Sequence, residues 1–243
     1  MVFVSKLKLL ALFSFLSLWS CSQKDNLTQE NVDAADSVQT KSLSYLALGD
    51  SYTIGTSIGE ENAYPHLLKA HLLKSDSISS VALKVIAQNG WTTQNLLDGI
   101  SHEQPDSTYD LVSLLIGVNN QYQGRDKLEY AQQFSQLLKQ SIAFAEGDTS
   151  RVVVISIPDW GATPSGASGR QSIAEDIDDF NEINRSITSS LGVTYVDVAP
   201  VSRTAIENSD LVAQDQLHFS GKMHELWLDL IAPKVEALLT RGN

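Results

Sequence analysis

A serine, a histidine and an aspartate in this chain have the types and the spacing that nucleophilic catalysis requires. Ser51 lies in the segment GDSYT, and Asp215 precedes His218 by three residues in DQLH. A serine hydroxyl is a weak nucleophile until a base removes its proton, and the base needs an acceptor that orients its second ring nitrogen. We therefore expect Ser51 to be the nucleophile, His218 the base and Asp215 the orienting acid, because so short a loop closes at little entropic cost.

Donors for a developing negative charge are also available in the chain. The candidates are the backbone N–H groups of Ser51 and Gly90 and the side-chain amide of Asn119. Donors of this kind stabilise the tetrahedral intermediate of acyl transfer, and the loss of one typically costs about 3 to 4 kcal/mol of transition-state stabilisation. We expect these three groups to form an oxyanion hole.

Each of these short segments has an ordinary structural alternative. Gly-Asp-Ser is a common turn sequence, IGVNN has the composition of a loop, and the Asp215–His218 spacing also suits a surface pair or a helix cap. Position favours the chemical interpretation, because every one of these segments follows an apolar run that predicts a strand.

The elements that position these residues are short apolar strands alternating with amphipathic helices. The apolar runs predict strands over residues 44–48, 81–87, 111–116, 151–157 and 193–198. Helical periodicity predicts helices over residues 64–74, 92–101, 126–145, 172–190 and 221–240. Within them we expect a capping box from Ser172 to Glu175 and a kink or break at Pro233. This alternation is typical of a three-layer α/β/α sandwich, in which ligands bind beyond the carboxyl ends of the strands.

The segments GDSYT, NGWTT, GVNN and DQLH together resemble the four sequence blocks of the SGNH (GDSL-type) hydrolases. The four residues of the family name correspond here to Ser51, Gly90, Asn119 and His218. The resemblance covers residues 45–240 and implies a flavodoxin-like, five-stranded parallel sheet of order 2-1-3-4-5. It also implies hydrolysis of an ester through a serine-bound acyl intermediate. The third block usually ends in aspartate, whereas this chain has Asn120 there.

Several further residues have a candidate place at or near the site. Trp91 and Trp160 follow strand ends and are candidates for the wall of a substrate site, although such residues as often only cover the core. The five histidines show no spacing typical of a metal site, so we expect neither a metal nor a cofactor. We expect the other histidines at the surface and favour solvent exposure over a place in the cleft for the last of them: His66, His71, His102 and His224.

The first residues of the chain have the pattern of an export signal. Two lysines precede an apolar run from Leu9 to Trp19, and the only cysteine, Cys21, follows shortly after it. This layout resembles a bacterial lipoprotein signal, in which the cysteine is acylated; the alternative is an ordinary signal peptide with an incidental thiol. We expect a signal peptide over residues 1–20, a polar tether over 21–42 and the hydrolase domain over 43–243.

The charge of the chain bears on its partners. With 29 acidic and 17 basic residues the formal net charge is −12, and it falls to −14 without the two lysines of the signal. Such a surface repels nucleic acid and anionic headgroups, so we expect no nucleic-acid partner and membrane attachment through an N-terminal lipid. The predicted location is the bacterial cell envelope, periplasmic or at the cell surface.

These features predict a serine esterase that acts on short acyl groups, such as acetyl groups on carbohydrate, since no long apolar lid segment is present to cover a lipid chain. A lysophospholipase or thioesterase is the first alternative. The second is a non-catalytic carbohydrate- or lipid-binding lipoprotein on the same fold. The complete set of Ser51, Asp215 and His218 favours catalysis over that second alternative.

Overall fold

The computed structural model describes residues 40–106 and 108–241. The predicted signal peptide, Cys21 and most of the predicted tether lie outside these residues. The first strand, β1 (Lys41–Gly49), begins two residues before the expected start of the hydrolase domain. In the described part of the chain, no helix combines the length and the apolar composition that crossing a membrane requires.

Five parallel strands form a single sheet. Their bounds are Lys41–Gly49 for β1, Ile78–Ala87 for β2, Leu111–Leu115 for β3, Val152–Ile155 for β4 and Thr194–Val196 for β5. The strand order is β2-β1-β3-β4-β5, and every pair is parallel. The structure therefore confirms the predicted flavodoxin-like sheet of order 2-1-3-4-5.

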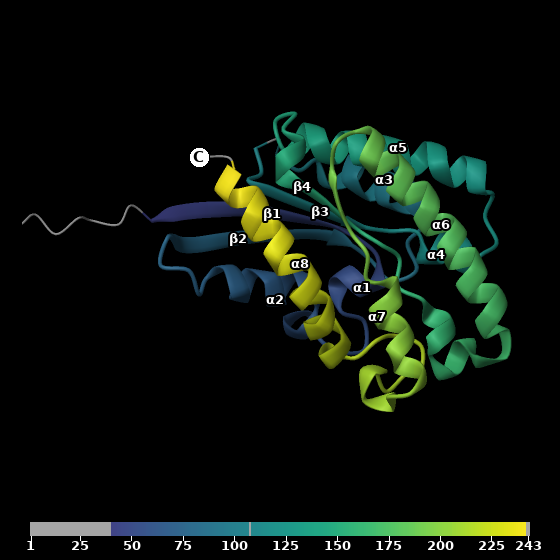
Figure 1. Ribbon diagram of the computed structural model, residues 1–243. Helices are drawn as coiled ribbons and strands as arrows, with labels where there is room; N and C mark the ends of the chain where they lie inside the picture. Colours follow the sequence, from purple (N-terminus) through teal and green to yellow (C-terminus); the bar gives the residue numbers. More distant parts are fainter. Residues whose placement is uncertain (1–39, 107, 242–243) are drawn as a thin grey trace, which may run out of the picture. The chain divides into compact units, whose positions relative to one another are not determined.

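Helices cover both faces of the sheet, as Figure 1 shows. One face packs against α2 (Tyr64–Leu72) and α8 (Gly221–Arg241), which contact each other. The opposite face packs against α3 (Thr93–Glu103), α5 (Lys127–Phe144) and α6 (Arg170–Ser190). Every residue of β3 and β4 is buried, which explains why these strands are apolar on both faces. The three-layer α/β/α sandwich is thus confirmed.

The strand register brings the loops that follow the strands to one edge of the sheet. Gly49, the last residue of β1, pairs with Ala87 at the end of β2 and with Leu115 at the end of β3. Three short helices that periodicity does not predict follow β1, β3 and β5 at this edge: α1 (Ser51–Ile54), α4 (Val118–Tyr122) and α7 (Ala199–Ser202). We call this the carboxyl edge, and the predicted site residues belong to its loops.

One local prediction within the helices is wrong, and another is wrong in part. The Ser172–Glu175 capping box does not form, because α6 already begins at Arg170 and continues directly from a 3₁₀ turn over Pro164–Gly169. Ser172 instead donates its hydroxyl to the Gly169 carbonyl at 2.9 Å. Of the kink or break expected at Pro233, the break is absent, because α8 continues through Pro233 to Arg241.

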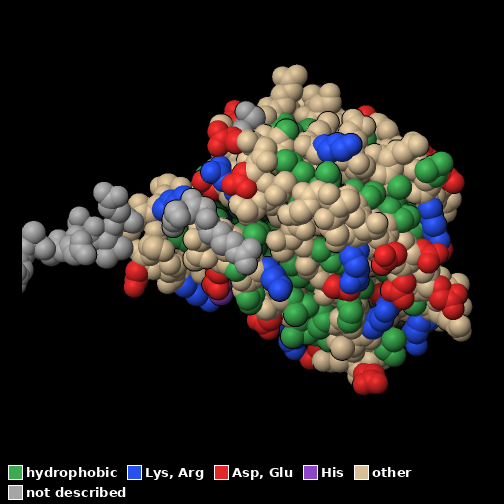
Figure 2. All heavy atoms as spheres, turned by 45° about the horizontal axis from the view of Figure 1, so that its top comes forward, with side chains coloured by type: hydrophobic (Ala, Val, Ile, Leu, Met, Phe, Trp, Pro, Cys, Tyr) green, Lys and Arg blue, Asp and Glu red, His purple; other side chains and the backbone are tan. Residues whose placement is uncertain are grey.

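Charged side chains on the face shown in Figure 2 are mixed in sign. Blue lysine and arginine side chains lie among red aspartate and glutamate side chains, with apolar side chains between them. On this face of the described residues the charges do not segregate into a single basic patch.

Candidate active site

Ser51 lies at the first turn of α1, directly after β1. A side chain at Gly49 would overlap the Thr53 side chain and the Leu115 carbonyl, so only glycine fits at this close approach. Ser51 is 4% exposed, and its hydroxyl makes no hydrogen bond to any described residue. The hydrogen bond expected between the Ser51 hydroxyl and His218 is therefore not formed among the described residues.

Asp50 is the residue that caps α1. Its carboxylate accepts a hydrogen bond from the Tyr52 N–H at 3.1 Å, while its second oxygen, Oδ2, has no partner among the described residues. Asp50 is fully buried, and this burial raises the pKa of its carboxyl group to about 7. Asp50 thus supports the turn that presents Ser51, whereas a different carboxylate contacts the histidine.

Asp215 and His218 form a close pair in the loop before α8. His218 Nδ1 lies 2.6 Å from Asp215 Oδ2, and Asp215 Oδ1 accepts the backbone N–H groups of Leu217 at 3.0 Å and His218 at 2.9 Å. The Ala213 N–H donates to the His218 carbonyl at 2.8 Å, which closes the loop. Partial burial opposes ionisation of Asp215, but the hydrogen bonds from Ser57, Leu217 and His218 outweigh it and lower the pKa of Asp215 well below its ordinary value.

Aromatic packing connects the helix that begins at Ser51 to the loop that carries His218. Tyr52, the residue after Ser51, makes an edge contact with the His218 ring at 5.7 Å between ring centroids. Tyr52 also packs against Phe219 at 5.9 Å and Trp227 at 5.8 Å, and all three side chains are buried. This buried cluster therefore packs the residue next to Ser51 against His218, although 167 positions separate Ser51 from His218 in the sequence.

The three expected oxyanion donors lie in adjacent loops of the carboxyl edge. Gly90 has φ +80° in the turn after β2, a conformation that glycine adopts without strain. Among the described residues, neither the Ser51 N–H nor the Gly90 N–H has a hydrogen-bond acceptor. Asn119 Nδ2 donates to the Trp91 carbonyl at 2.9 Å, which joins the Asn119 amide to the loop that contains Gly90.

Asn120, which replaces the usual aspartate of the third sequence block, still makes a contact between loops. Its Oδ1 accepts the Thr93 N–H at 2.9 Å, and its Nδ2 donates to the Thr93 hydroxyl at 2.8 Å. The Thr93 hydroxyl in turn donates to Gln133 at 2.5 Å. An amide can both accept and donate in this way, whereas a carboxylate can only accept. Asn120 therefore connects the loops after β2 and β3.

The two tryptophans predicted for the substrate wall have different surroundings. The Trp91 ring lies against Gly99 of α3 and is half-buried there. Trp160 donates its Nε1–H to Gln121 at 2.8 Å, and its ring contacts that of Tyr122 at 5.1 Å between centroids. Tyr122 is 61% exposed and lies one helical turn after Asn119 on α4. We call Tyr122 and Trp160 the aromatic pair.

Two residues of the site escape sequence analysis, and a third is misplaced by it. Ser57 donates its hydroxyl to Asp215 at 2.5 Å, and Tyr122 completes the aromatic pair. No short motif marks either contact, because each joins segments that lie far apart in the chain.

His224 is 1% exposed, so its predicted surface position is wrong. Its Nδ1 accepts the Tyr64 N–H at 3.1 Å, and burial, assisted by the nearby His218, lowers its pKa to about 3.

We expect the substitution His224→Asn to change how the free energy of unfolding depends on pH. The pKa of His224 is about 3 in the folded protein, against 6.5 for an ordinary histidine. The stabilisation from a neutral ring is therefore present above pH 6.5 and is lost as the pH falls towards 3. Within that window the wild type should lose about 1.4 kcal/mol per pH unit relative to the variant. The raised pKa of Asp50 has the opposite effect, since its contribution to the free energy of unfolding falls as the pH rises. Asp50 is present in both proteins, so this contribution cancels in the difference between them.

Urea unfolding of both proteins between about pH 7 and pH 5 measures this difference. Loss of packing against Trp227, whose ring lies 4.2 Å from that of His224, adds an offset that does not depend on pH. A stability difference that stays constant across this range would contradict a buried neutral His224.

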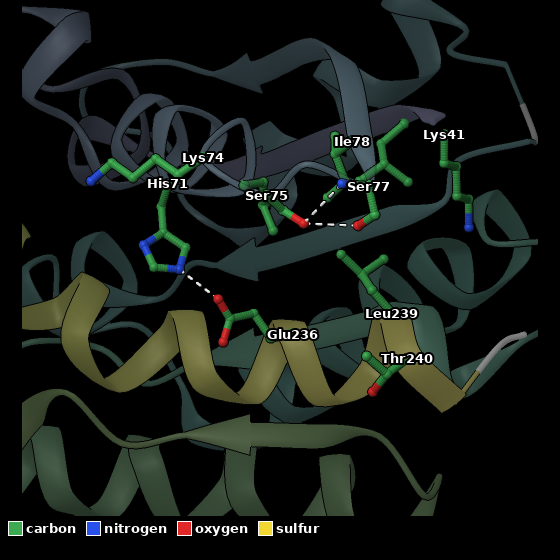
Figure 3. Close-up of a pocket in the computed structure, with 11 residues that line it drawn as sticks. Lys41, His71, Lys74, Ser75, Ser77, Ile78, Glu236, Leu239 and Thr240 are labelled. Atoms are coloured by element: carbon green, nitrogen blue, oxygen red, sulfur yellow. Dashed lines mark hydrogen bonds and ion pairs between the residues drawn. The ribbon is translucent and has the colours of Figure 1, made fainter. Parts of the chain in front are cut away.

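A cavity of about 610 Å³ lies away from these residues. Its walls come from the start of β1, the ends of α2 and α8, and the segment before β2, and the His71–Glu236 contact at 2.7 Å crosses it (Figure 3). Lys41 lines the cavity, whereas Ser51 follows the other end of β1, and a strand of this length spans about 26 Å. The cavity therefore belongs to the opposite edge of the sheet from Ser51.

Solved structures with this fold include several hydrolases. LAE5, described as an alpha/beta hydrolase enzyme from the metagenome of Lake Arreo in Spain, superposes with a TM-score of 0.63 at 16% identity, covering 83% of this chain and 98% of its own. A lipase/acylhydrolase from Enterococcus faecalis gives 0.61 at 20% identity, with 80% and 96% covered. A variant of Axe2, an acetyl-xylooligosaccharide esterase from Geobacillus Stearmophilus, gives 0.64 at 15% identity, with 81% and 95% covered. At these identities the likeness shows the fold.

Comparison of the sequence itself identifies the family. No curated protein matches the chain significantly. Residues 47–226, which are more than half of the chain and include Ser51, Gly90, Asn119, Asp215 and His218, match the sequence profile of the GDSL-like Lipase/Acylhydrolase family. With the predicted fold confirmed and its sequence blocks together at the carboxyl edge, this chain belongs to the GDSL-like lipase/acylhydrolase family of hydrolases.

Proposed function

We propose that this protein is an exported serine esterase that hydrolyses short acyl esters of carbohydrates. The observation that carries the proposal is the Asp215–His218 pair, 2.6 Å apart, packed through Tyr52 against the helix that begins at Ser51. The N–H groups of Ser51 and Gly90, which have no acceptor among the described residues, and the amide of Asn119 lie in the same set of loops. A nucleophile, a base with its orienting acid, and oxyanion donors are the parts that acyl transfer requires.

In the proposed reaction the Ser51 oxygen forms a bond to the ester carbonyl carbon while His218 Nε2 accepts the hydroxyl proton. The carbonyl electron pair moves to the oxygen, where the three donors stabilise its charge. Collapse of this intermediate breaks the bond to the alcohol, which leaves with the proton from His218. Water then attacks the acyl-serine with His218 as base, which releases the acid and restores Ser51. Throughout, Asp215 stays ionised and orients Nδ1.

The aromatic pair supports a carbohydrate as the alcohol part of the substrate. Tyr122 is largely exposed, and the hydrogen bond from Trp160 to Gln121 fixes the second ring. Asp159 is buried, accepts the Gly161 N–H at 2.9 Å and pairs with Arg203 at 2.7 Å, so the segment that carries Trp160 is also held in place. A rigid, exposed aromatic face can pack against the apolar C–H face of a sugar ring. Tyr122 follows Asn119, a proposed oxyanion donor, by one turn of the same helix, which supports a role near the reacting ester.

Two observations support a short acyl group. Gly90 is exposed and Asn119 only half-buried, so two of the three proposed oxyanion donors are accessible from the surface, while Ser51 is buried. The cavity shown in Figure 3 belongs to the other edge of the sheet, so it offers no room for a long acyl chain at Ser51. Axe2, described as an acetyl-xylooligosaccharide esterase, has the same fold and provides a precedent for this substrate class.

The expected substrate preference separates this proposal from its alternatives. We expect turnover of p-nitrophenyl acetate and of acetylated xylo-oligosaccharides, with p-nitrophenyl palmitate slower. Faster hydrolysis of palmitoyl esters would favour the lysophospholipase or thioesterase alternative. Binding of a glycan or lipid without any turnover would favour a non-catalytic lipoprotein. The lipid anchor at Cys21 and the cell-envelope location stay predictions from the sequence.

The substitution Tyr122→Ala tests the aromatic pair. We expect the KM for an acetylated oligosaccharide to rise about two- to twelvefold, because an aromatic contact contributes about 0.5 to 1.5 kcal/mol. The kcat/KM for p-nitrophenyl acetate should stay within about twofold, since that ester has no sugar ring to stack and the substitution removes no catalytic group. Initial-rate kinetics on both substrates measures the split.

Leu73→Ala is the matched control for removal of an exposed apolar side chain. Leu73 is 41% exposed and follows α2 at the opposite edge of the sheet, so both KM values should be those of the wild type. Equal losses on both substrates in Tyr122→Ala would point to a disturbed α4, and unchanged values on both would exclude the aromatic pair as a sugar site.

A further inference from the structure

A second serine contacts the proposed catalytic acid. The Ser57 hydroxyl donates to Asp215 Oδ2 at 2.5 Å, and this is the oxygen that lies 2.6 Å from His218 Nδ1. The other oxygen, Oδ1, accepts two backbone N–H groups of its own loop. Ser57 therefore provides a contact to Asp215 from outside that loop, and it comes from the same segment as Ser51.

The backbone at Ser57 is in a conformation that its residue type disfavours. Its φ is +69°, in the left-handed region, which few residues other than glycine adopt. Such a conformation persists where the surroundings determine it. The loop around it is indeed closed by hydrogen bonds from the Ile58 N–H to the Gly55 carbonyl at 3.1 Å and from Asn62 Nδ2 to the Ile58 carbonyl at 2.8 Å. A glycine would fit this backbone with less strain, so the serine hydroxyl is the part with a distinct use.

We propose that Ser57 is a positioning residue that aims Asp215 at His218, a role that rests on the serine esterase mechanism proposed above. When His218 accepts the Ser51 proton it becomes an imidazolium, and Asp215 must then be ionised and must face Nδ1. The Asp215 side chain is 31% exposed, so water competes for its oxygens. The Ser57 hydroxyl occupies one acceptor direction of Oδ2 and restricts rotation of the carboxylate, and it keeps its own proton in every step.

Two substitutions at Ser57 separate the hydroxyl from the backbone. Ser57→Gly removes the hydroxyl and relieves the positive φ, whereas Ser57→Ala removes the hydroxyl and keeps the strain. We expect kcat for p-nitrophenyl acetate to fall about tenfold in both variants with KM unchanged, the effect typical of losing a hydrogen bond to a charged group. The melting temperature of Ser57→Gly should equal or exceed that of the wild type, so the loss of rate cannot come from unfolding.

Gln104→Gly is the matched control. Gln104 also has a positive φ, +42°, and it is exposed at the end of α3. Its replacement relieves strain in the same way without touching the Asp215 loop, so kcat should be unchanged.

A double-mutant cycle with Asp215→Ala shows whether Ser57 acts through Asp215. In that background, Ser57→Gly should have no further effect on kcat, because the group that it positions is absent. A wild-type kcat in Ser57→Gly, or the same tenfold loss in the Asp215→Ala background, would overturn the proposal.

The labelling rate of Ser51 by a fluorophosphonate provides a readout that does not depend on the ester chosen. The wild type should react rapidly, and Ser57→Gly about tenfold more slowly. Equal rates would overturn the role of Ser57 while leaving the esterase proposal intact. A wild type that shows neither labelling nor ester turnover would instead overturn the esterase proposal, and the role of Ser57 with it.

Discussion

Replacement of Ser51 by alanine should abolish ester hydrolysis and leave the protein folded. The Ser51 hydroxyl makes no hydrogen bond within the described residues, so its removal leaves no buried partner unsatisfied. Alanine is also well suited to the first turn of α1. We expect the free energy of unfolding to change by less than about 1 kcal/mol. Because the nucleophile is lost, kcat should fall by roughly four orders of magnitude or more.

Hydrolysis of p-nitrophenyl acetate, circular dichroism on heating and labelling with a fluorophosphonate together check this expectation. Ser77→Ala is the matched control, because Ser77 is an exposed serine that lines the cavity at the opposite edge of the sheet. That variant should keep both turnover and labelling. Wild-type turnover or labelling in Ser51→Ala would end the assignment of Ser51 as the nucleophile.

The substitution Asp215→Asn should lower kcat by roughly 10³- to 10⁴-fold, although it changes only one atom of the side chain. Asp215 accepts two hydrogen bonds on each oxygen, from Ser57 and His218 on Oδ2 and from two backbone N–H groups on Oδ1. An asparagine must place its NH₂ group against one of these donor pairs, and flipping the amide only exchanges which pair is opposed. The His218 ring then loses the acceptor that orients it, or the loop loses its closing contacts.

Asp210→Asn is the matched control for the loss of one negative charge. Asp210 lies five residues before Asp215 and pairs with Lys222 at 2.7 Å, with both side chains about two-thirds exposed. An exposed pair of this kind contributes little to stability, so activity and melting temperature should stay close to those of the wild type. Steady-state kinetics on both variants measures the contrast. An Asp215→Asn enzyme that keeps more than about a tenth of the wild-type kcat would show that another group orients His218.

The sequence was sufficient to predict the sheet and the edge at which the site lies. Strands such as Leu111–Leu115 and Val152–Ile155 are buried on both faces, so their apolar runs are continuous and easily identified. Parallel strands joined by crossover helices place all their carboxyl ends at one edge, so residues that come directly after the strands meet there. Asp215 and His218 were within reach of the same reasoning, because three residues and one loop are enough to pair them.

Contacts between distant segments could not be predicted in this way. Ser57 and Asp215 are 158 positions apart, and Tyr64 and His224 are 160 apart, so neither contact leaves a local pattern. His224 lies on a helix with both buried and exposed positions, and the face that it occupies depends on how α8 packs against α2. In the sequence Asn120 is only a departure from the family motif, because its two hydrogen bonds to Thr93 depend on the spacing of two loops.

The sequence alone was enough to predict the succession of strands and helices and the carboxyl edge, because these depend on local periodicity. The residues that follow the predicted strands also supplied the candidates Ser51, Gly90, Asn119, Asp215 and His218. Only the tertiary structure decided which side chains touch. It paired Ser57 with Asp215, buried His224 and placed Tyr122 beside Trp160. The physical reason is that a hydrogen bond depends on side-chain direction and distance to within a few tenths of an ångström, and packing across the whole chain sets both.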